Sequence, residues 1–383
     1  MFLHFFAFGS FTPILSLYLL KDLGFSGYQV GLVLAAGAIS SVLTPIISSF
    51  VADKIIATER IFAISHLSGS ILMFALYKST SFPAVITLYF FYMAFIGPSM
   101  PLSDTIIFHH ISDRRKYGNI RVWGTIGWIA VALFFGFFIM QKSGGFAYTL
   151  LLSSISSLVV AGFTFFIPAT KISNQSNSSF LPVTAFKILM RPNVLVLVLI
   201  TLLVFIVDRF YFYGSSPYLK SVGFPENYIL PYLSIGQVLE ICAMVTLVRF
   251  MTKFKAKSIL VAGLFINLLR YAFLAFFQGK GMTIVAIALH GAAYTFIFST
   301  IYILLDFETE KESRAGVHQL FRIIYLGLGT FLGNLAAGFI LDRFVIAGDY
   351  RIFWIVPAVL MIVILMVAFF FDKERKTDPA TAP

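Results

Sequence analysis

Long runs of apolar residues recur along the whole chain and constrain its fold more than any other feature. A helix needs roughly 20 apolar residues to cross the hydrocarbon core of a membrane. The strands of a membrane β-barrel would be about 10 residues long and strictly alternating, which these runs are not. The sequence therefore predicts an all-α integral membrane protein with twelve transmembrane helices. The expected spans are about 1–20, 28–52, 60–77, 83–108, 119–141, 147–168, 191–214, 228–250, 257–277, 282–305, 316–341 and 352–371.

Composition and charge agree with this class and orient the chain in the membrane. The sequence is 59% hydrophobic and 12% charged, whereas soluble domains carry about 25% charged residues. The net charge of +11 lies mainly in short loops, so it indicates cytoplasmic connections and no nucleic-acid partner. With both termini inside, the inner side holds 18 Lys and Arg residues and the outer side holds 7. We therefore expect a multi-pass protein of a bacterial inner (plasma) membrane with both termini cytoplasmic.

One polar connection divides the expected spans into two sets of six. Residues 171–187 are rich in Ser and Asn and include Pro182, which is typical of a linker. Two six-helix bundles joined by an inner linker are the layout of a major facilitator transporter, whose halves rock about a central site. The predicted organisation is an N-terminal bundle over 1–168, a cytoplasmic linker over 169–190, a C-terminal bundle over 191–372 and a cytoplasmic tail over 373–383.

Ionisable side chains inside the expected spans are candidates for function, because each costs roughly 2.5–3.5 kcal/mol to insert into a membrane. Buried charges are normally paired. Asp104 and Arg121 lie on helices joined by a short basic turn and are the expected pair of the first half. In the second half, either Asp208 or Glu240 is expected beside Arg270.

Several of these charges also have a structural interpretation. Arg121 lies near the basic turn, so its side chain could reach the cytoplasmic surface. Asp208 is followed by Arg209 and could form a structural pair near the outer end of its helix. His318 and Arg322 are four residues apart and share a helix face, where they could form a gate or contact substrate.

The segment 117–128, YGNIRVWGTIGW, resembles the fifth-helix signature of the lactose-permease-like branch of the major facilitators. This branch includes nucleoside:proton symporters and phenylpropionate-permease-like proteins. In lactose permease the equivalent of Arg121 pairs with an acid at the position of Asp104 and binds sugar. The first helices resemble the phenylpropionate-permease-like group. The second half is most similar to nucleoside:proton symporters, in segments 237–240, 270–271, 290–298 and 319–321.

These patterns and the resemblance together define a candidate site. Lactose permease carries a protonatable Glu three residues after its helix 10 His, where this chain has Ala293. Proton coupling is therefore expected to use Glu240 or Asp208, with Arg270 as the cation that modulates the carboxyl group. The expected substrate-binding residues are Asp104, Arg121, Trp128, Tyr211, Gln237, His290, Tyr294, Gln319 and Arg322.

The expected function is secondary active transport. The chain would carry a small polar or aromatic solute, with a nucleoside or sugar favoured, together with a proton by alternating access. A proton-driven exporter of metabolites or drugs is the alternative, and a non-transporting membrane sensor or scaffold is the second alternative. An enzyme is disfavoured, and no catalytic residue, cofactor or metal site is expected, because the loops are short. We expect a monomer, and we expect its single cysteine, Cys242, to pack within an apolar run.

Overall fold

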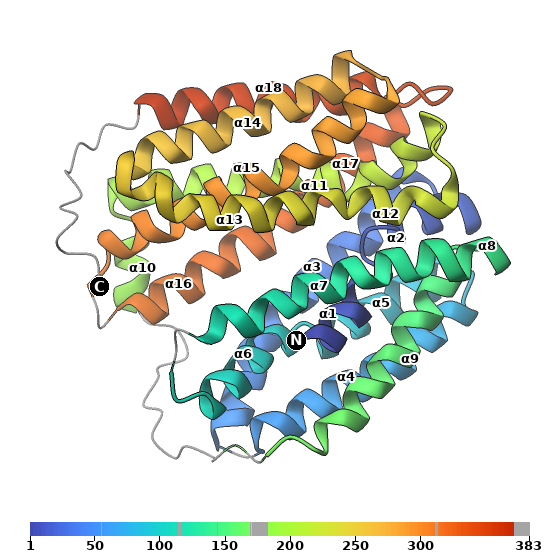
Figure 1. The fold of residues 1–383 in the computed structure, drawn as a ribbon, viewed down its shortest axis with the longest axis horizontal. Helices are drawn as coiled ribbons and strands as arrows, with labels where there is room; N and C mark the ends of the chain where they lie inside the picture. The colour runs from blue at the N-terminus through green and yellow to red at the C-terminus, as the bar shows by residue number, and fades with distance from the viewer. Residues whose placement is uncertain are drawn as a thin grey trace.

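The computed structural model describes residues 1–54, 56–113, 116–143, 145–168, 170, 183–310 and 313–370. The described part is helical, and its helices form two groups that lie one above the other in Figure 1. The first group, here called the first half, comprises α1 (Phe2–Gly9), α2 (Leu15–Leu17), η1 (Tyr18–Asp22), α3 (Gly27–Lys54), α4 (Thr58–Lys78), α5 (Phe82–Ile96), α6 (Ser99–His110), α7 (Tyr117–Phe134), η3 (Phe135–Ile139), α8 (Met140–Ser143) and α9 (Ala147–Thr164).

The second group, here called the second half, follows the expected linker. It comprises α10 (Val183–Leu189), α11 (Pro192–Ser221), η4 (Glu226–Tyr228), α12 (Ile229–Leu233), α13 (Ile235–Lys253), α14 (Ala256–Phe276), α15 (Lys280–Phe307), α16 (Arg314–Arg322), η5 (Ile323–Gly329), α17 (Thr330–Phe344) and α18 (Arg351–Phe370).

Among the described residues, nine helical segments are long and apolar enough to cross a membrane. The chain is therefore a multi-pass helical membrane protein. Two further apolar helices, Gly27–Val42 and Tyr148–Thr164, fall at expected spans but are shorter. The first expected span, 1–20, is not one continuous helix. It breaks into α1, α2 and η1 around Pro13, which has no backbone N–H to donate.

Within the expected linker 169–190, Val183–Leu189 form the helix α10, whose Ala185, Ile188 and Leu189 are buried. One other expectation needs correction. Cys242 does not pack inside the protein, since its side chain is exposed. The polar part of the linker at 171–182, the basic residues 114–115 and the expected tail 373–383 lie outside the described residues.

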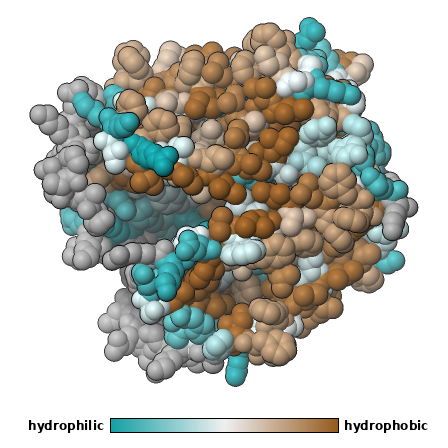
Figure 2. Space-filling model, viewed as in Figure 1, coloured by the Kyte–Doolittle hydropathy of each residue, from teal (hydrophilic) through white to brown (hydrophobic). Residues whose placement is uncertain are grey.

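Apolar side chains face outward over much of the lateral surface, as Figure 2 shows. Val248, Phe163 and Ile71 are 68%, 57% and 64% exposed, which suits contact with lipid rather than with water. Figure 2 also shows a hollow between the two halves, at the end of the protein where α10 and α16 lie.

The opposite end is closed by contacts between the halves. Helix α3 of the first half packs along α17 of the second half. Ser16 in α2 meets Ser216 in α11, with the two hydroxyl oxygens 3.2 Å apart. The protein is therefore open at one end and closed at the other, and its central region lies between these two ends.

Candidate substrate and proton site

A small pocket lies where the two halves meet. Both halves contribute to its wall, which combines aromatic rings with a few polar groups. The lining residues are Pro13, Trp128, Tyr211, Phe212, Ser215, Leu233 and Gln237. Three of the predicted substrate-binding residues, Trp128, Tyr211 and Gln237, are thus brought together here. The Gln237 Oε1 atom is buried without a hydrogen-bond partner, so a ligand that donates a hydrogen bond would satisfy it.

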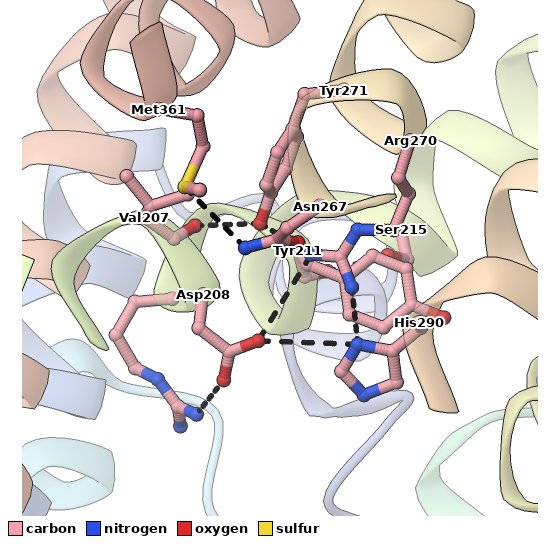
Figure 3. A network of polar contacts seen from close by, with 10 residues as sticks. Val207, Asp208, Tyr211, Ser215, Asn267, Arg270, Tyr271, His290 and Met361 are labelled. Carbon is pink, nitrogen blue, oxygen red and sulfur yellow. Dashed lines mark hydrogen bonds and ion pairs between the residues drawn. The ribbon is translucent and has the colours of Figure 1, made fainter. Parts of the chain in front are cut away.

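Next to this pocket, a network of buried charges joins α11, α14 and α15 (Figure 3). The Asp208 carboxylate accepts a hydrogen bond of 2.7 Å from Arg209 Nη2. Its other oxygen lies 4.0 Å from Arg270 Nη2 and 4.0 Å from His290 Nδ1. The sequence left two acids open as partners of Arg270, and the structure selects Asp208. The pairing of Asp208 with Arg209 is also present, as part of the same network.

Arg270 is held at the centre of this network. Its side chain is 1% exposed, and its guanidinium lies 4.4 Å from the ring centres of both Tyr211 and Tyr271. One guanidinium nitrogen contacts His290 Nδ1, and the other donates to the Tyr271 hydroxyl. Tyr271 in turn donates to the backbone carbonyl of Val207 at 2.8 Å. Because Tyr211 also lines the pocket, the network supports one wall of the pocket directly.

His290 and Tyr294 lie on α15 and extend the cluster of aromatic rings around Tyr211. The His290 ring stacks on Tyr211, with ring centres 4.4 Å apart. Tyr294 lies one helical turn further on, and its ring centre is 6.1 Å from that of His290. His290 thus contacts a pocket residue, Tyr211, but neither His290 nor Tyr294 is a lining residue, so their binding of substrate stays a prediction.

Glu240 lies on α13, away from the Arg270 network. Its side chain is half-buried, and its backbone carbonyl accepts a hydrogen bond from Thr295 on α15. Within the described part of the chain, no ion pair within 4 Å is formed by this carboxylate. The cation that acts on it most strongly is Arg121, from the other half of the protein. The alternative pairing of Glu240 with Arg270 is therefore wrong.

The expected direct pair of Asp104 with Arg121 is also wrong. The Asp104 carboxylate accepts a hydrogen bond of 2.8 Å from the hydroxyl of Tyr117, which begins α7. No ion pair within 4 Å joins Asp104 to Arg121, both of which the structure describes. Arg121 lies over the ring of Phe5, 4.4 Å from its centre. The short Asp104 side chain reaches Tyr117, one turn before Arg121, so Tyr117 takes the place that the sequence assigned to the arginine.

A glycine makes room for Arg121 in this position. A Cβ atom added at Gly124 would lie 2.9 Å from Arg121 Nη1 and 2.8 Å from Phe5 Cδ2. Both distances are shorter than ordinary carbon contacts, so any side chain at 124 would displace the guanidinium or the ring. Gly124 therefore leaves the space that the Arg121 guanidinium and the Phe5 ring occupy.

Six of the predicted substrate-binding residues do not line the pocket, namely Asp104, Arg121, His290, Tyr294, Gln319 and Arg322. Gln319 and Arg322 are exposed on α16 and are not among the lining residues, so their roles stay predictions. Their neighbour His318 contacts Asp306 at 2.5 Å and stacks on Tyr302. In the described part of the chain, no three His, Cys, Asp or Glu side chains gather as metal ligands.

Sequence reasoning missed several residues of the site. Pro13, Phe212 and Ser215 line the pocket. Phe5 packs against Arg121, and Tyr117 donates a hydrogen bond to Asp104. Only Tyr117 had a usable signal, because it lies four residues before Arg121 and so shares its helix face. Phe5 lies on α1 and Pro13 lies in the break that follows it. In a chain with 45 Phe and 14 Pro residues, no signal in the sequence identifies these two as site residues.

Comparison with known proteins identifies the family. The profile described as nucleoside H+ symporter matches residues 1–377. The putative nucleoside transporter YegT of Escherichia coli K12 is 27% identical over 401 residues, which covers 99% of this chain and 93% of YegT. The xanthosine permease of the same organism is 24% identical over 404 residues, covering 99% of this chain and 95% of the permease.

Solved structures show the same fold. The crystal structure of the nucleoside transporter NupG superposes with a TM-score of 0.87 at 22% identity, covering 98% of this chain and 97% of NupG. A bacterial homologue of the lysosomal transporter Spinster, in an inward-facing conformation, gives a TM-score of 0.75 at 15% identity, covering 96% of this chain and 94% of that protein. These relatives are membrane transporters and not enzymes. Because the family profile covers nearly the whole chain, the protein belongs to the nucleoside H+ symporter family.

Proposed function

We propose that this protein imports nucleosides together with protons across a bacterial inner membrane. In this proposal twelve spans form two six-helix bundles, 1–168 and 191–372, and both termini are cytoplasmic. The pocket between the halves carries the proposal, because it combines aromatic walls with an unpaired amide oxygen and adjoining buried charges. A single chain supplies all of these groups, so the proposed transporting unit is a monomer.

The pocket suits a nucleobase. Trp128, Tyr211 and Phe212 offer aromatic surfaces against which a planar ring can stack, a contact worth about 0.5–1.5 kcal/mol beyond simple burial. The buried Gln237 amide offers both a donor and an acceptor, which match the alternating donors and acceptors on the edge of a base. A sugar without a base would leave the aromatic surfaces unused, so a nucleoside is favoured over a simple sugar.

Arg121 is the proposed donor to the ribose hydroxyls. A guanidinium presents five N–H donors in a fixed plane, and that of Arg121 is already oriented by Phe5 and Gly124. Asp104 has an indirect part, because its partner is Tyr117, which shares the helix face of Arg121. Asp104 and Tyr117 would thus hold α6 and α7 in register beneath the arginine.

Glu240 is the proposed proton carrier. Asp208 already faces Arg209, Arg270 and His290, so its negative charge is compensated in place. Glu240 has no such set of partners, and the cation that acts on it belongs to the other half. A neutral carboxyl group is much less costly to enclose than a charged one. Protonation of Glu240 would therefore let the loaded carrier reorient.

The described conformation fits one stage of such a cycle. The hollow opens at the end that carries α10 and α16, which is the cytoplasmic end in the proposed orientation (Figure 2). Substrate and proton would leave through this hollow. The empty carrier would then close there and open at the other end.

Uptake by proteoliposomes tests this function. The purified protein is reconstituted, and radiolabelled uridine and inosine are added with and without an inward proton gradient. We expect accumulation above the outside concentration only with the gradient. The Glu240→Gln variant should still exchange nucleoside for nucleoside, but it should not accumulate it. Glu310→Gln is the control, because Glu310 is an exposed surface residue that should behave as wild type.

Three outcomes would contradict the proposal. Gradient-independent, non-concentrative uptake would exclude proton coupling. Nucleoside loss from the vesicles on acidifying the outside would indicate a proton-driven exporter. Absence of both exchange and uptake by a folded protein would favour a membrane sensor or scaffold.

A further inference from the structure

At the closed end of the protein, a carboxylate of the second half binds the start of a long helix in the first half. Helix α3 begins at Gly27, and its first backbone N–H groups have no partner within the helix. Asp342, near the end of α17, accepts hydrogen bonds from the N–H groups of Gly27 and Tyr28, the latter at 2.7 Å. The helix therefore receives its capping side chain from the other half of the protein.

The two helices are packed so closely that this contact is well defined. A Cβ atom added at Gly31 would lie 2.8 Å from the carbonyl oxygen of Asn334 in α17. A Cβ atom added at Gly338 would lie 2.5 Å from the carbonyl oxygen of Gly27. Backbone thus meets backbone along α3 and α17. Separation of the halves at this end must move Gly27 away from Asp342.

Besides the contact of Ser16 with Ser216, two further polar contacts cross between the halves at the same end. The hydroxyl of Tyr213 in α11 donates to the carbonyl oxygen of Gly27. Lys21 Nζ lies 2.6 Å from a carboxylate oxygen of Glu226, which also binds Lys220. The lysine pairs are partly exposed, and such pairs contribute little to stability. The contact of Asp342 differs because it joins a charge to the positive end of a 28-residue helix.

We propose that Asp342 is a positioning residue of the transport cycle, which holds the outer end closed by capping α3 across the interface between the halves. This inference rests on the proposed alternating-access function. Opening of the outer end exposes the N–H groups of Gly27 and Tyr28 to water and removes their charged acceptor. Asp342 therefore shifts the resting equilibrium toward the outward-closed state, and its loss shifts it toward the outward-open state.

Reaction of a buried cysteine tests this equilibrium. Cys242 is replaced by serine, and Ser16→Cys is introduced. Ser16 is 2% exposed and lies in the chain between the pocket residue Pro13 and Lys21 at the closed end. A maleimide should reach it when the outer end opens. In purified, detergent-solubilised protein, we expect Asp342→Asn to raise the labelling rate about fivefold, which corresponds to roughly 1 kcal/mol.

Asp349→Asn is the matched control. Asp349 is also a carboxylate of the closed end, and the N–H of Arg351 holds its pKa below the usual value. Its partners, Gln278 and Arg351, belong to its own half. We therefore expect no change in labelling for this variant, whereas a general effect of charge removal would affect both variants alike.

A labelling rate for Asp342→Asn within twofold of the control would overturn the proposal, provided that size-exclusion profiles match. Tyr213→Phe removes an independent contact with Gly27, and it should raise the labelling rate in the same direction. If Asp342→Asn does not fold, a rate for Tyr213→Phe equal to the control overturns the proposal. Labelling requires no substrate, so its outcome is independent of whether the protein carries nucleosides.

The affinity for nucleoside at the outer side gives a second measure of the equilibrium between the outward-closed and outward-open states. The apparent dissociation constant for a ligand rises as the fraction of binding-competent protein falls. If the outward-open state is the minor one, Asp342→Asn should lower the external KM for nucleoside by up to about fivefold while increasing the labelling rate equally. A purely structural defect would instead reduce the number of active molecules, and it would leave KM unchanged.

Discussion

Replacement of Arg270 by methionine tests whether the buried charge network stabilises the second half. Arg270 is 1% exposed, and its guanidinium contacts Tyr211, Tyr271 and His290. It also lies 4.0 Å from the Asp208 carboxylate. Methionine fills a similar volume with a flexible apolar chain, so the substitution removes the charge and its hydrogen bonds with little change in packing.

The expected loss in the free energy of unfolding depends on which contacts of Asp208 remain after the substitution. Removal of one partner of a buried pair costs about 3–5 kcal/mol, since the other charge stays buried without compensation. Here Asp208 keeps its 2.7 Å bond to Arg209, which places the cost near the lower end, at about 3 kcal/mol. For a unit of 150–250 residues, 1 kcal/mol shifts the Tm by roughly 2–4 °C. We therefore expect the Tm to fall by about 6–12 °C.

Thermal unfolding of the purified protein in detergent measures this shift. Arg351→Met is the control, because Arg351 is 67% exposed and its contact with Asp349 is 3.9 Å long. Exposed pairs contribute about 0–1 kcal/mol, so the control should change the Tm by at most about 4 °C. A Tm for Arg270→Met equal to that of the control would refute the role given to the network.

The double variant sharpens this test. Asp208→Asn alone leaves the buried Arg270 and the half-buried Arg209 without their shared anion. If the two groups compensate each other, the combination with Arg270→Met should cost less than the sum of the single changes. A coupling of about 0.5–3 kcal/mol is typical for residues in one network. Simple additivity would show that Asp208 and Arg270 act independently.

Three further predictions concern the first half and the closed end. Gly124→Ala should raise the KM for nucleoside at least about tenfold by displacing Arg121. Gly118→Ala on the same helix should not, because a Cβ atom there meets no other atom within 4 Å. Equal KM values for the two variants in uptake assays would contradict this prediction. Tyr117→Phe removes the bond to Asp104 and should raise the KM by only a few-fold, which competition binding can measure. Lys21→Gln should increase maleimide labelling of Ser16→Cys less than Asp342→Asn does, because its pair is partly exposed; a larger increase would assign the closure to Lys21.

Much of the architecture could be predicted because membrane helices impose a strong pattern. Nine expected spans correspond to helical segments that are long and apolar enough in the described residues. The first span was predicted as continuous, since mean hydropathy does not register the break around Pro13. The helix α10 was missed because its seven residues follow a polar stretch and are stabilised by packing rather than by composition.

The candidate site was predicted in parts but not in its pairings. Intramembrane charges are rare, so Asp208, Glu240 and Arg270 could be identified from the sequence alone. Their partners depend on how helices far apart in the chain are arranged. Helices α11, α14 and α15 bring Asp208 to Arg270, and the meeting of the two halves brings Arg121 toward Glu240. Sequence spacing carries no information on either contact.

The Asp104 pairing failed for a local reason. Asp104 lies on α6, and Tyr117 and Arg121 lie on α7, the next helix of the chain. Tyr117 begins α7, and its hydroxyl donates to the Asp104 carboxylate. Arg121 shares the helix face of Tyr117 but lies one turn further along α7, so it was the wrong choice of partner for Asp104.

The central claim is that nucleoside and proton move together through a site that uses Glu240. Its most direct test is the proton movement that a nucleoside drives. Unbuffered proteoliposomes without a pH gradient receive external uridine, and an electrode follows the external pH. We predict transient alkalinisation outside for the wild-type protein and none for Glu240→Gln, although the variant still exchanges nucleosides. Uridine entry into wild-type vesicles without any pH change would contradict symport, and alkalinisation by Glu240→Gln would exclude Glu240 as the proton carrier.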